Sequence, residues 1–187
     1  DADVVEEFNI VRQNFQYGDL GEYKALTLTS KINRNFLTRY KSVNTNFNCE
    51  KFNLNKDSRA NIYITCVDNA QFRIEFDQLF KKINDYQNEN DNEPDYRKTF
   101  YWLDLGNNKN QGQAILGSTT IQQPNSDQYQ DTLRTVIDMF PNLKELDTEE
   151  IQGKGCGFAD KIQEQDLIIN DSLTALRSKI IRDILIR

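Results

Sequence analysis

Apolar residues recur every three or four positions in five stretches of the chain, and this spacing predicts five amphipathic helices. The stretches cover about residues 2–16, 22–41, 68–83, 124–141 and 166–186. The third stretch has the most regular stripe in the first half of the chain, formed by Phe72, Phe76, Leu79, Phe80 and Ile83. Pro141 ends the fourth stretch, because proline cannot continue a helix.

Two other parts of the chain predict β-hairpins. Ile62, Ile64 and Cys66 alternate with their neighbours, and residues 47–54 precede them across a polar turn at 55–58. Alternation next to a turn of this composition is typical of a hairpin. Further along, residues 99–105 read as a strand, and after a turn at 107–112 the chain returns as a second strand over 113–121.

This order of elements predicts an α+β fold. We expect an antiparallel sheet of about four strands, built from two hairpins and packed with about five helices, in the order α-α-ββ-α-ββ-α-α. The length of 187 residues fits a single domain over residues 1–187. Residues 88–98 are expected to form a mobile, solvated acidic loop that contains Asp91, Glu93 and Asp95, and residues 148–165 are expected to be irregular.

The composition supports a packed core but also a polar surface. Eleven Phe, eight Tyr and one Trp compensate for a hydrophobic fraction of only 37%, because each aromatic side chain buries a large area. The chain is rich in Asn and Gln. Its net charge of −6 argues against constitutive binding to nucleic acid. No apolar run is long enough to predict a membrane span, and a start at Asp1 rather than Met suggests a processed form or an excised fragment.

Cys49 and Cys66 predict a possible disulfide. If the first hairpin turns between residues 57 and 58, these two cysteines lie opposite each other on paired strands. Directly opposed residues at a non-hydrogen-bonded site have Cα atoms about 4.5 Å apart, which is near the lower limit for a disulfide. The alternative is two small thiols packed on the apolar face of the sheet. A disulfide would favour an extracytoplasmic compartment; without it the sequence assigns no compartment.

The chain contains no histidine, and this excludes the usual Ser-His-Asp and Cys-His catalytic arrangements. It also excludes zinc sites that contain histidine. No Walker A or G-x-G-x-x-G motif is present. We therefore expect no catalytic residue, no cofactor and no metal site, although paired carboxylates could still support catalysis.

One region combines basic and aromatic residues. Its basic residues are Lys31, Arg34, Arg39, Lys41, Lys51, Lys56 and Arg59. Interleaved with them are Phe36, Tyr40, Phe47, Phe52 and Tyr63. We expect these aromatic residues to form part of the core, with the charges on the outside. In the alternative they are exposed, and basic residues beside exposed aromatic rings are typical of surfaces that hold single-stranded nucleic acid.

Together these observations favour a non-enzymatic protein-interaction or structural domain that is part of a larger protein or assembly and binds other proteins. Two alternatives stay open. The first is single-stranded nucleic-acid binding through residues 31–59. The second is a small-ligand pocket or a carboxylate-based enzyme.

Overall fold

The computed structural model describes residues 2–57, 59–90, 92–107, 112–120, 132–143, 175 and 178–183. The chain forms two compact units. The first unit contains Asp1–Asn48 and Gly155–Glu164, and the second contains Cys49–Lys154 and Gln165–Arg187. The single domain over residues 1–187 stays a prediction. Within the described residues, no helix is long and apolar enough to cross a membrane.

Residues 2–48 of the first unit form two α-helices and a short 3₁₀ helix. Helix α1 spans Glu7–Arg12, η1 spans Tyr17–Asp19 and α2 spans Lys24–Phe36. The backbone near the N-terminus pairs with the residues just before α2, through a bridge between Val4 and Tyr23. Both α-helices are shorter than the sequence predicts. Thr27, Thr29 and Ser30, which are weak helix formers, nevertheless lie inside α2.

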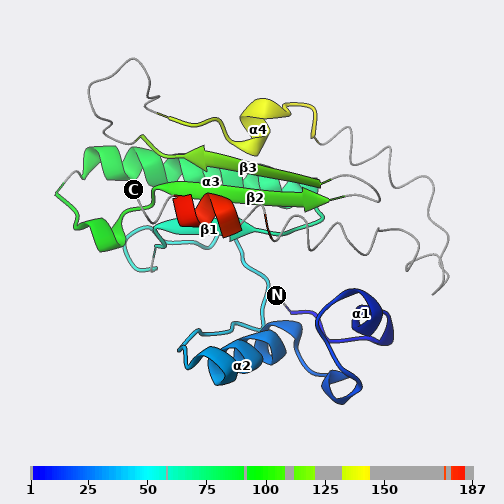
Figure 1. The fold of residues 1–187 in the computed structure, drawn as a ribbon. Helices are drawn as coiled ribbons and strands as arrows, with labels where there is room; N and C mark the ends of the chain where they lie inside the picture. The colour runs from blue at the N-terminus through cyan, green and yellow to red at the C-terminus, as the bar shows by residue number, and fades with distance from the viewer. Residues whose placement is uncertain are drawn as a thin grey trace. The chain divides into compact units, whose positions relative to one another are not determined.

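The second unit is built on a three-stranded mixed sheet (Figure 1). Strand β1 spans Ile62–Thr65, β2 spans Tyr101–Asn107 and β3 spans Gly112–Ser118. Strands β2 and β3 form the predicted antiparallel hairpin, whereas β1 pairs with β2 in parallel. Helix α3, Ala70–Glu89, lies in the connection between β1 and β2. Parallel neighbours require such a crossover, and a helix is its usual form.

The predicted first hairpin is therefore wrong, and so is the sheet of four antiparallel strands. Residues 47–54 form no strand; turns occupy this part of the chain around residues 49–51 and 54–56. Cys49, Phe52 and Leu54 still pack, half-buried, against the core beside α3. Apolar residues that anchor a loop produced the spacing that we interpreted as a strand.

The absence of this hairpin also removes the predicted disulfide. Cys49 and Cys66 are both thiols, and no disulfide joins them. Cys49 lies in a turn, and Cys66 follows β1 with an exposed side chain. Burial, followed by the charge of Glu75, raises the pKa of the Cys49 thiol, which makes it a poor nucleophile at neutral pH. The sequence argument for an extracytoplasmic compartment loses its basis.

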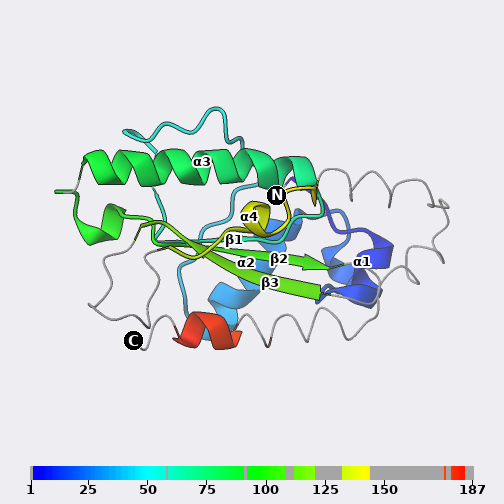
Figure 2. The same ribbon diagram turned by 90° about the horizontal axis from the view of Figure 1, so that it is seen from above.

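The core of the second unit lies between α3 and one face of the sheet (Figure 2). The predicted apolar stripe of α3 is confirmed: Phe76, Leu79, Phe80 and Ile83 are buried. The ring of Trp102 on β2 packs edge-on to the ring of Phe76, with 5.0 Å between the ring centres. The centre of the Phe80 ring lies 5.8 Å from that of Trp102. Burying a side chain of this size stabilises the fold by about 1.5–3 kcal/mol.

A buried polar network joins α3 to the ends of β1 and β2. Arg73 donates from Nε to both carboxylate oxygens of Asp104 at 3.0 Å. The hydroxyl of Thr65 donates to Asp104 at 2.6 Å, and the indole N–H of Trp102 donates to that hydroxyl at 2.8 Å. Asp104 is 1% exposed. This ion pair therefore fixes the register of the parallel strands against the helix.

After residue 120, only short stretches of the chain are described. Helix α4 spans Val136–Met139 and begins after Thr135, whose hydroxyl accepts a hydrogen bond from the backbone N–H of Asp138. The predicted helix over 124–141 is thus confirmed only at its end, because residues 132–135 are not helical. Residues 178–183 are helical, and the rest of the predicted helix over 166–186 lies outside the described residues except for residue 175. The predicted irregular stretch 148–165 also lies outside them.

Candidate functional site

A shallow pocket of about 210 Å³ lies between α3, β3 and the residues that precede α4. Two of its charged side chains, those of Lys81 and Asp138, are engaged with each other. Asp77 accepts hydrogen bonds from the Thr135 hydroxyl and from Lys81, each at 2.7 Å. Lys81 also lies 3.5 Å from Asp138, whose other oxygen accepts from the backbone N–H of Thr135.

The pKa shifts in this pocket keep both exposed partners charged. The hydrogen bond to Asp77 raises the pKa of Lys81. Burial alone would raise the pKa of Asp138, but the N–H of Thr135 and the charge of Lys81 hold it below its ordinary value. A lysine kept protonated and a carboxylate kept ionised by a neighbour are weak as general base and acid. Asp77, Lys81 and Asp138 therefore fasten α4 to α3.

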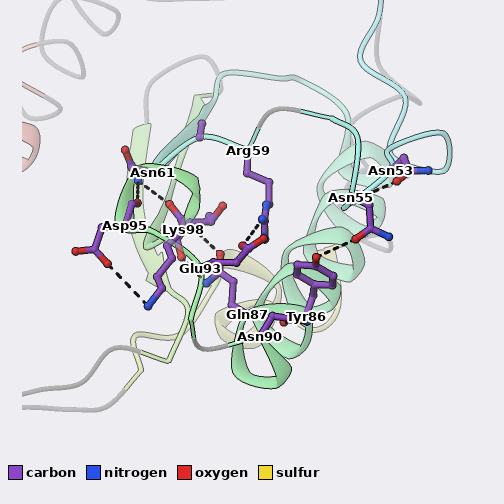
Figure 3. A network of polar contacts seen from close by, with 12 residues as sticks. Asn53, Asn55, Arg59, Asn61, Tyr86, Gln87, Asn90, Glu93, Asp95 and Lys98 are labelled. Atoms are coloured by element: carbon purple, nitrogen blue, oxygen red, sulfur yellow. Dashed lines mark hydrogen bonds and ion pairs between the residues drawn. The ribbon is translucent and has the colours of Figure 1, made fainter.

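A second polar cluster surrounds Arg59, which lies shortly before β1 in the chain (Figure 3). Its side chain has no exposed surface, and its Nη2 forms an ion pair with the carboxylate of Glu93. The guanidinium also lies over the ring of Tyr86, 4.9 Å from the ring centre. Within the described residues, Nε and Nη1 of Arg59 have no hydrogen-bond acceptor.

This cluster changes the interpretation of the acidic stretch 88–98. Helix α3 continues to Glu89, and Asp95–Arg97 form the short 3₁₀ helix η2. The amide of Asn61 donates to the carbonyl oxygens of Asp95 and Lys98 and ties this stretch to the start of β1. The prediction that Glu93 is solvated is wrong, because it neutralises a buried arginine. The mobility of residues 88–98 stays a prediction.

No cluster of three or more potential metal ligands exists in the part of the chain that the structure describes. Glu93 and Asp95 of the acidic stretch are among the residues that this part includes. Glu93 already has a cationic partner in Arg59. Asp95 lies 3.8 Å from Lys98.

Two lysines of α2, in the first unit, form ion pairs with residues that precede the helix. Lys24 forms an ion pair with Asp3 at 3.2 Å, and Lys31 forms one with Asp19. The ammonium of Lys31 also lies 5.8 Å from the ring centre of Phe15. The hydrogen bond from Lys31 lowers the pKa of Asp19. Because Lys24 and Lys31 are seven residues apart, they lie on one side of the helix.

The apolar side of α2 remains exposed. None of the residues of α2 is buried. Leu28, Ile32 and Phe36 follow one another at four-residue spacing, which places them in a row about 12 Å long. Phe36 is 74% exposed, and beyond it Leu37 and Tyr40 are 90% and 63% exposed. An amphipathic helix normally buries its apolar residues, whereas those of α2 stay partly or largely exposed.

The chain leaves α2 through a strained residue. Leu37 has φ 53° and ψ 34°, the left-handed conformation in which glycine is usual. Asn33 holds the segment that follows: its side-chain oxygen accepts from the Thr38 hydroxyl and from the backbone N–H of Tyr40, each at 2.8 Å. Its amide donates to the carbonyl oxygen of Tyr40 at 2.9 Å. Asn33 thereby fixes Tyr40 relative to the end of the helix.

Replacing Leu37 with glycine should stabilise α2. A residue other than glycine in the left-handed conformation costs about 1–2 kcal/mol, and Leu37→Gly removes this strain. Glycine also has a larger entropy in the unfolded state, which cancels about 0.5–1 kcal/mol of the gain in stability. We expect amide hydrogen exchange in the last turn of α2 to slow by about 2–5-fold. Leu37→Ala, which removes the same side chain but keeps the strain, is the control and should not slow it. Equal exchange in the two variants would contradict this interpretation.

The seven basic residues of the predicted nucleic-acid region lie in both units. Those in the first unit are Lys31, Arg34, Arg39 and Lys41, and those in the second are Lys51, Lys56 and Arg59. Lys31 and Arg59 are engaged in the ion pairs described above. Arg34, Arg39 and Lys41 are exposed, and none of the three forms an ion pair within the described residues.

The aromatic residues of that region divide in the same way. Phe52 and Tyr63 pack against the core of the second unit, as expected. Phe36, Tyr40 and Phe47 are exposed, so for these three the expectation of a core position is wrong. The candidate functional site is therefore the exposed group of Leu28, Ile32, Phe36, Leu37 and Tyr40 with the neighbouring Arg34, Arg39 and Lys41. We call these eight residues the α2 surface.

The chain matches no protein-family model, no curated protein and no solved structure. The case for the α2 surface therefore rests on its geometry. Sequence reasoning placed Arg34, Arg39 and Lys41 in a candidate site, but it missed Leu28 and Leu37. The positive φ of Leu37 is a feature of the backbone and leaves no signal in residue type, since leucine is an uncommon choice there.

Proposed function

We propose that this chain is a non-enzymatic interaction domain that docks on another protein through the α2 surface. The observation that carries the proposal is the exposure of the apolar residues of α2. Its lysines bind the rest of the unit, while its leucine, isoleucine and phenylalanine side chains lie exposed. Contiguous exposed apolar side chains that are rimmed by polar residues are typical of protein–protein interfaces.

The strain at Leu37 supports the same proposal. A bulky residue in the left-handed region costs free energy, and its side chain is almost fully exposed, so the isolated unit gains little from it. Strain of this kind persists most often where function requires it. A partner that covers Leu37 would compensate for the cost.

Single-stranded nucleic acid is the second candidate, and one observation favours it. Phe36 and Tyr40 are exposed close in sequence to Arg34, Arg39 and Lys41. Base stacking on aromatic rings beside a positively charged groove is the usual way such strands are held. Three of the five apolar side chains of the surface are aliphatic, however, and these offer no ring for stacking.

The test compares Phe36→Ser with Tyr17→Ser. Tyr17 is a matched control, since it lies in the same unit and is 77% exposed. The full-length chain and both variants are immobilised, and proteins retained from extracts of the cells that make the chain are identified and purified. Isothermal titration with each purified protein should show binding at least about 10-fold weaker for Phe36→Ser, as for a central hot-spot residue, and nearly unchanged for Tyr17→Ser.

Two results would contradict the proposal. One is that no purified protein distinguishes the two variants. The other is retention of a (dT)₂₀ oligonucleotide that decreases with salt and is lost with Phe36→Ser, which would support the second candidate. No oligonucleotide retention at low salt would exclude that candidate.

A further inference from the structure

The segment of the sequence that forms the α2 surface carries charges of one sign only. Between Glu22 and Glu50 the sequence contains no acidic residue, although the whole chain has a net charge of −6. Five basic residues lie in this interval: Lys24, Lys31, Arg34, Arg39 and Lys41. Ion pairs engage the first two, whereas Arg34, Arg39 and Lys41 are exposed and form no ion pair with the described residues.

We infer that the partner presents an acidic amphipathic segment, with apolar side chains that cover Leu28, Ile32 and Phe36 and carboxylates that face Arg34, Arg39 and Lys41. This inference rests on the proposed docking function and names the chemistry of the partner. Interfaces place charges of opposite sign opposite each other, because like charges across an interface cost several kcal/mol. A row of apolar residues at four-residue spacing suits packing against a second helix.

Charge also argues against a second copy of this chain as the occupant. In a two-fold symmetric dimer the same patch lies on both sides of the interface. A surface that carries Arg34, Arg39 and Lys41 would then face a surface of the same sign of charge. The resulting repulsion disfavours self-association through this surface.

The shape of the surface disfavours a lipid bilayer. Helices that lie in a membrane interface bury their apolar face to a depth of about 5–10 Å. Leu28 and Ile32 are only 36% and 40% exposed, so most of their surface is already covered and cannot insert to that depth. The partly exposed aliphatic row likewise fits a peptide better than nucleic-acid bases.

A displayed library of random 16-residue peptides, selected against the full-length chain, tests the inference. We expect the selected peptides to be enriched in Asp and Glu, depleted in Lys and Arg, and to carry apolar residues three or four positions apart. Binding to Phe36→Ser should be at least about 10-fold weaker. The triple variant Arg34→Glu, Arg39→Glu and Lys41→Glu should lose the acidic peptides and instead select basic ones.

The control triple variant is Lys82→Glu, Arg97→Glu and Lys179→Glu. It makes the same change of net charge at three exposed positions of the second unit, and it should bind the selected peptides within about twofold of the parent chain, because none of the three residues belongs to the α2 surface. Equal losses in the two triple variants would mean that net charge alone drives binding, which would overturn the inference.

Other outcomes also decide the question. Selected peptides that are neutral or basic, or no selected sequence at all, would overturn the inference. So would (dT)₂₀ or phosphatidylserine vesicles that bind more tightly than the best peptide through the same residues. A purified partner that depends on Phe36 but contacts the chain without an acidic segment would overturn this inference while leaving the proposed docking function intact.

Discussion

Replacing Asp104 with alanine should lower the free energy of unfolding of the second unit by about 3–5 kcal/mol, the usual cost of removing one partner of a buried ion pair. Asp104 is the carboxylate that Arg73 binds through Nε, and Arg73 is itself only 7% exposed. The mutation leaves a buried guanidinium without its counter-charge. Thr65 also loses the acceptor of its hydroxyl.

Urea denaturation measures this effect directly, because Trp102 is the only tryptophan of the chain and lies in the same network. A double-mutant cycle with Arg73→Leu and Asp104→Leu provides the control. The double variant should lose clearly less stability than the sum of the two single variants, since neither charge is then left unpaired. A loss below about 1.5 kcal/mol for Asp104→Ala would contradict the interpretation of a buried pair, since the expected loss is about 3–5 kcal/mol.

Replacing Glu93 with leucine should cost a similar amount, about 3–5 kcal/mol. The side chain of Arg59 is completely buried, and Glu93 is its only charged partner in the described part of the chain. Two of its nitrogen atoms already have no acceptor there. Without Glu93 only the ring of Tyr86 is left to stabilise the cation. Chemical denaturation of the full-length chain measures the loss.

Two further variants separate this buried pair from ordinary surface charge. Arg59→Met combined with Glu93→Leu removes both charges and should restore most of the stability, as replacement of a buried pair by apolar residues often does. Asp95→Ala breaks the neighbouring pair with Lys98, in which the Asp95 side chain is 88% exposed. This surface change should cost about 1 kcal/mol or less. Equal losses for Asp95→Ala and Glu93→Leu would contradict the buried pair.

The elements that depend on local signals were predictable from the sequence. The stripe from Phe72 to Ile83 identified α3, and the turn between two apolar stretches identified the hairpin of β2 and β3. The strand that pairs with β1 was not predictable in the same way, because an alternating pattern predicts a strand but not which other strand it pairs with. One signal was available: a strand, then a helix, then a strand is the order of a parallel crossover unit.

The candidate site shows a different limit. The apolar residues of α2 predicted burial, because periodicity indicates which side of a helix is apolar but not whether anything covers it. Only the structure shows that the apolar residues of α2 stay exposed within the described part of the chain. Arg59 gives the opposite case. Its position in a basic stretch predicted exposure, and only its partner Glu93, distant in sequence, explains its burial.

The parallel pairing of β1 also has a consequence for synthesis on the ribosome. Thr65 and Asp104, which face each other in the register of β1 and β2, are 39 residues apart. At about 5–20 residues per second, β1 therefore emerges seconds before its neighbour and has no strand to pair with during that time. Helix α3, made of local contacts, can form in this interval, and its stripe offers Tyr63 an apolar surface before the sheet exists. The helix that connects the two strands is thus also suited to protect the first one until the second arrives.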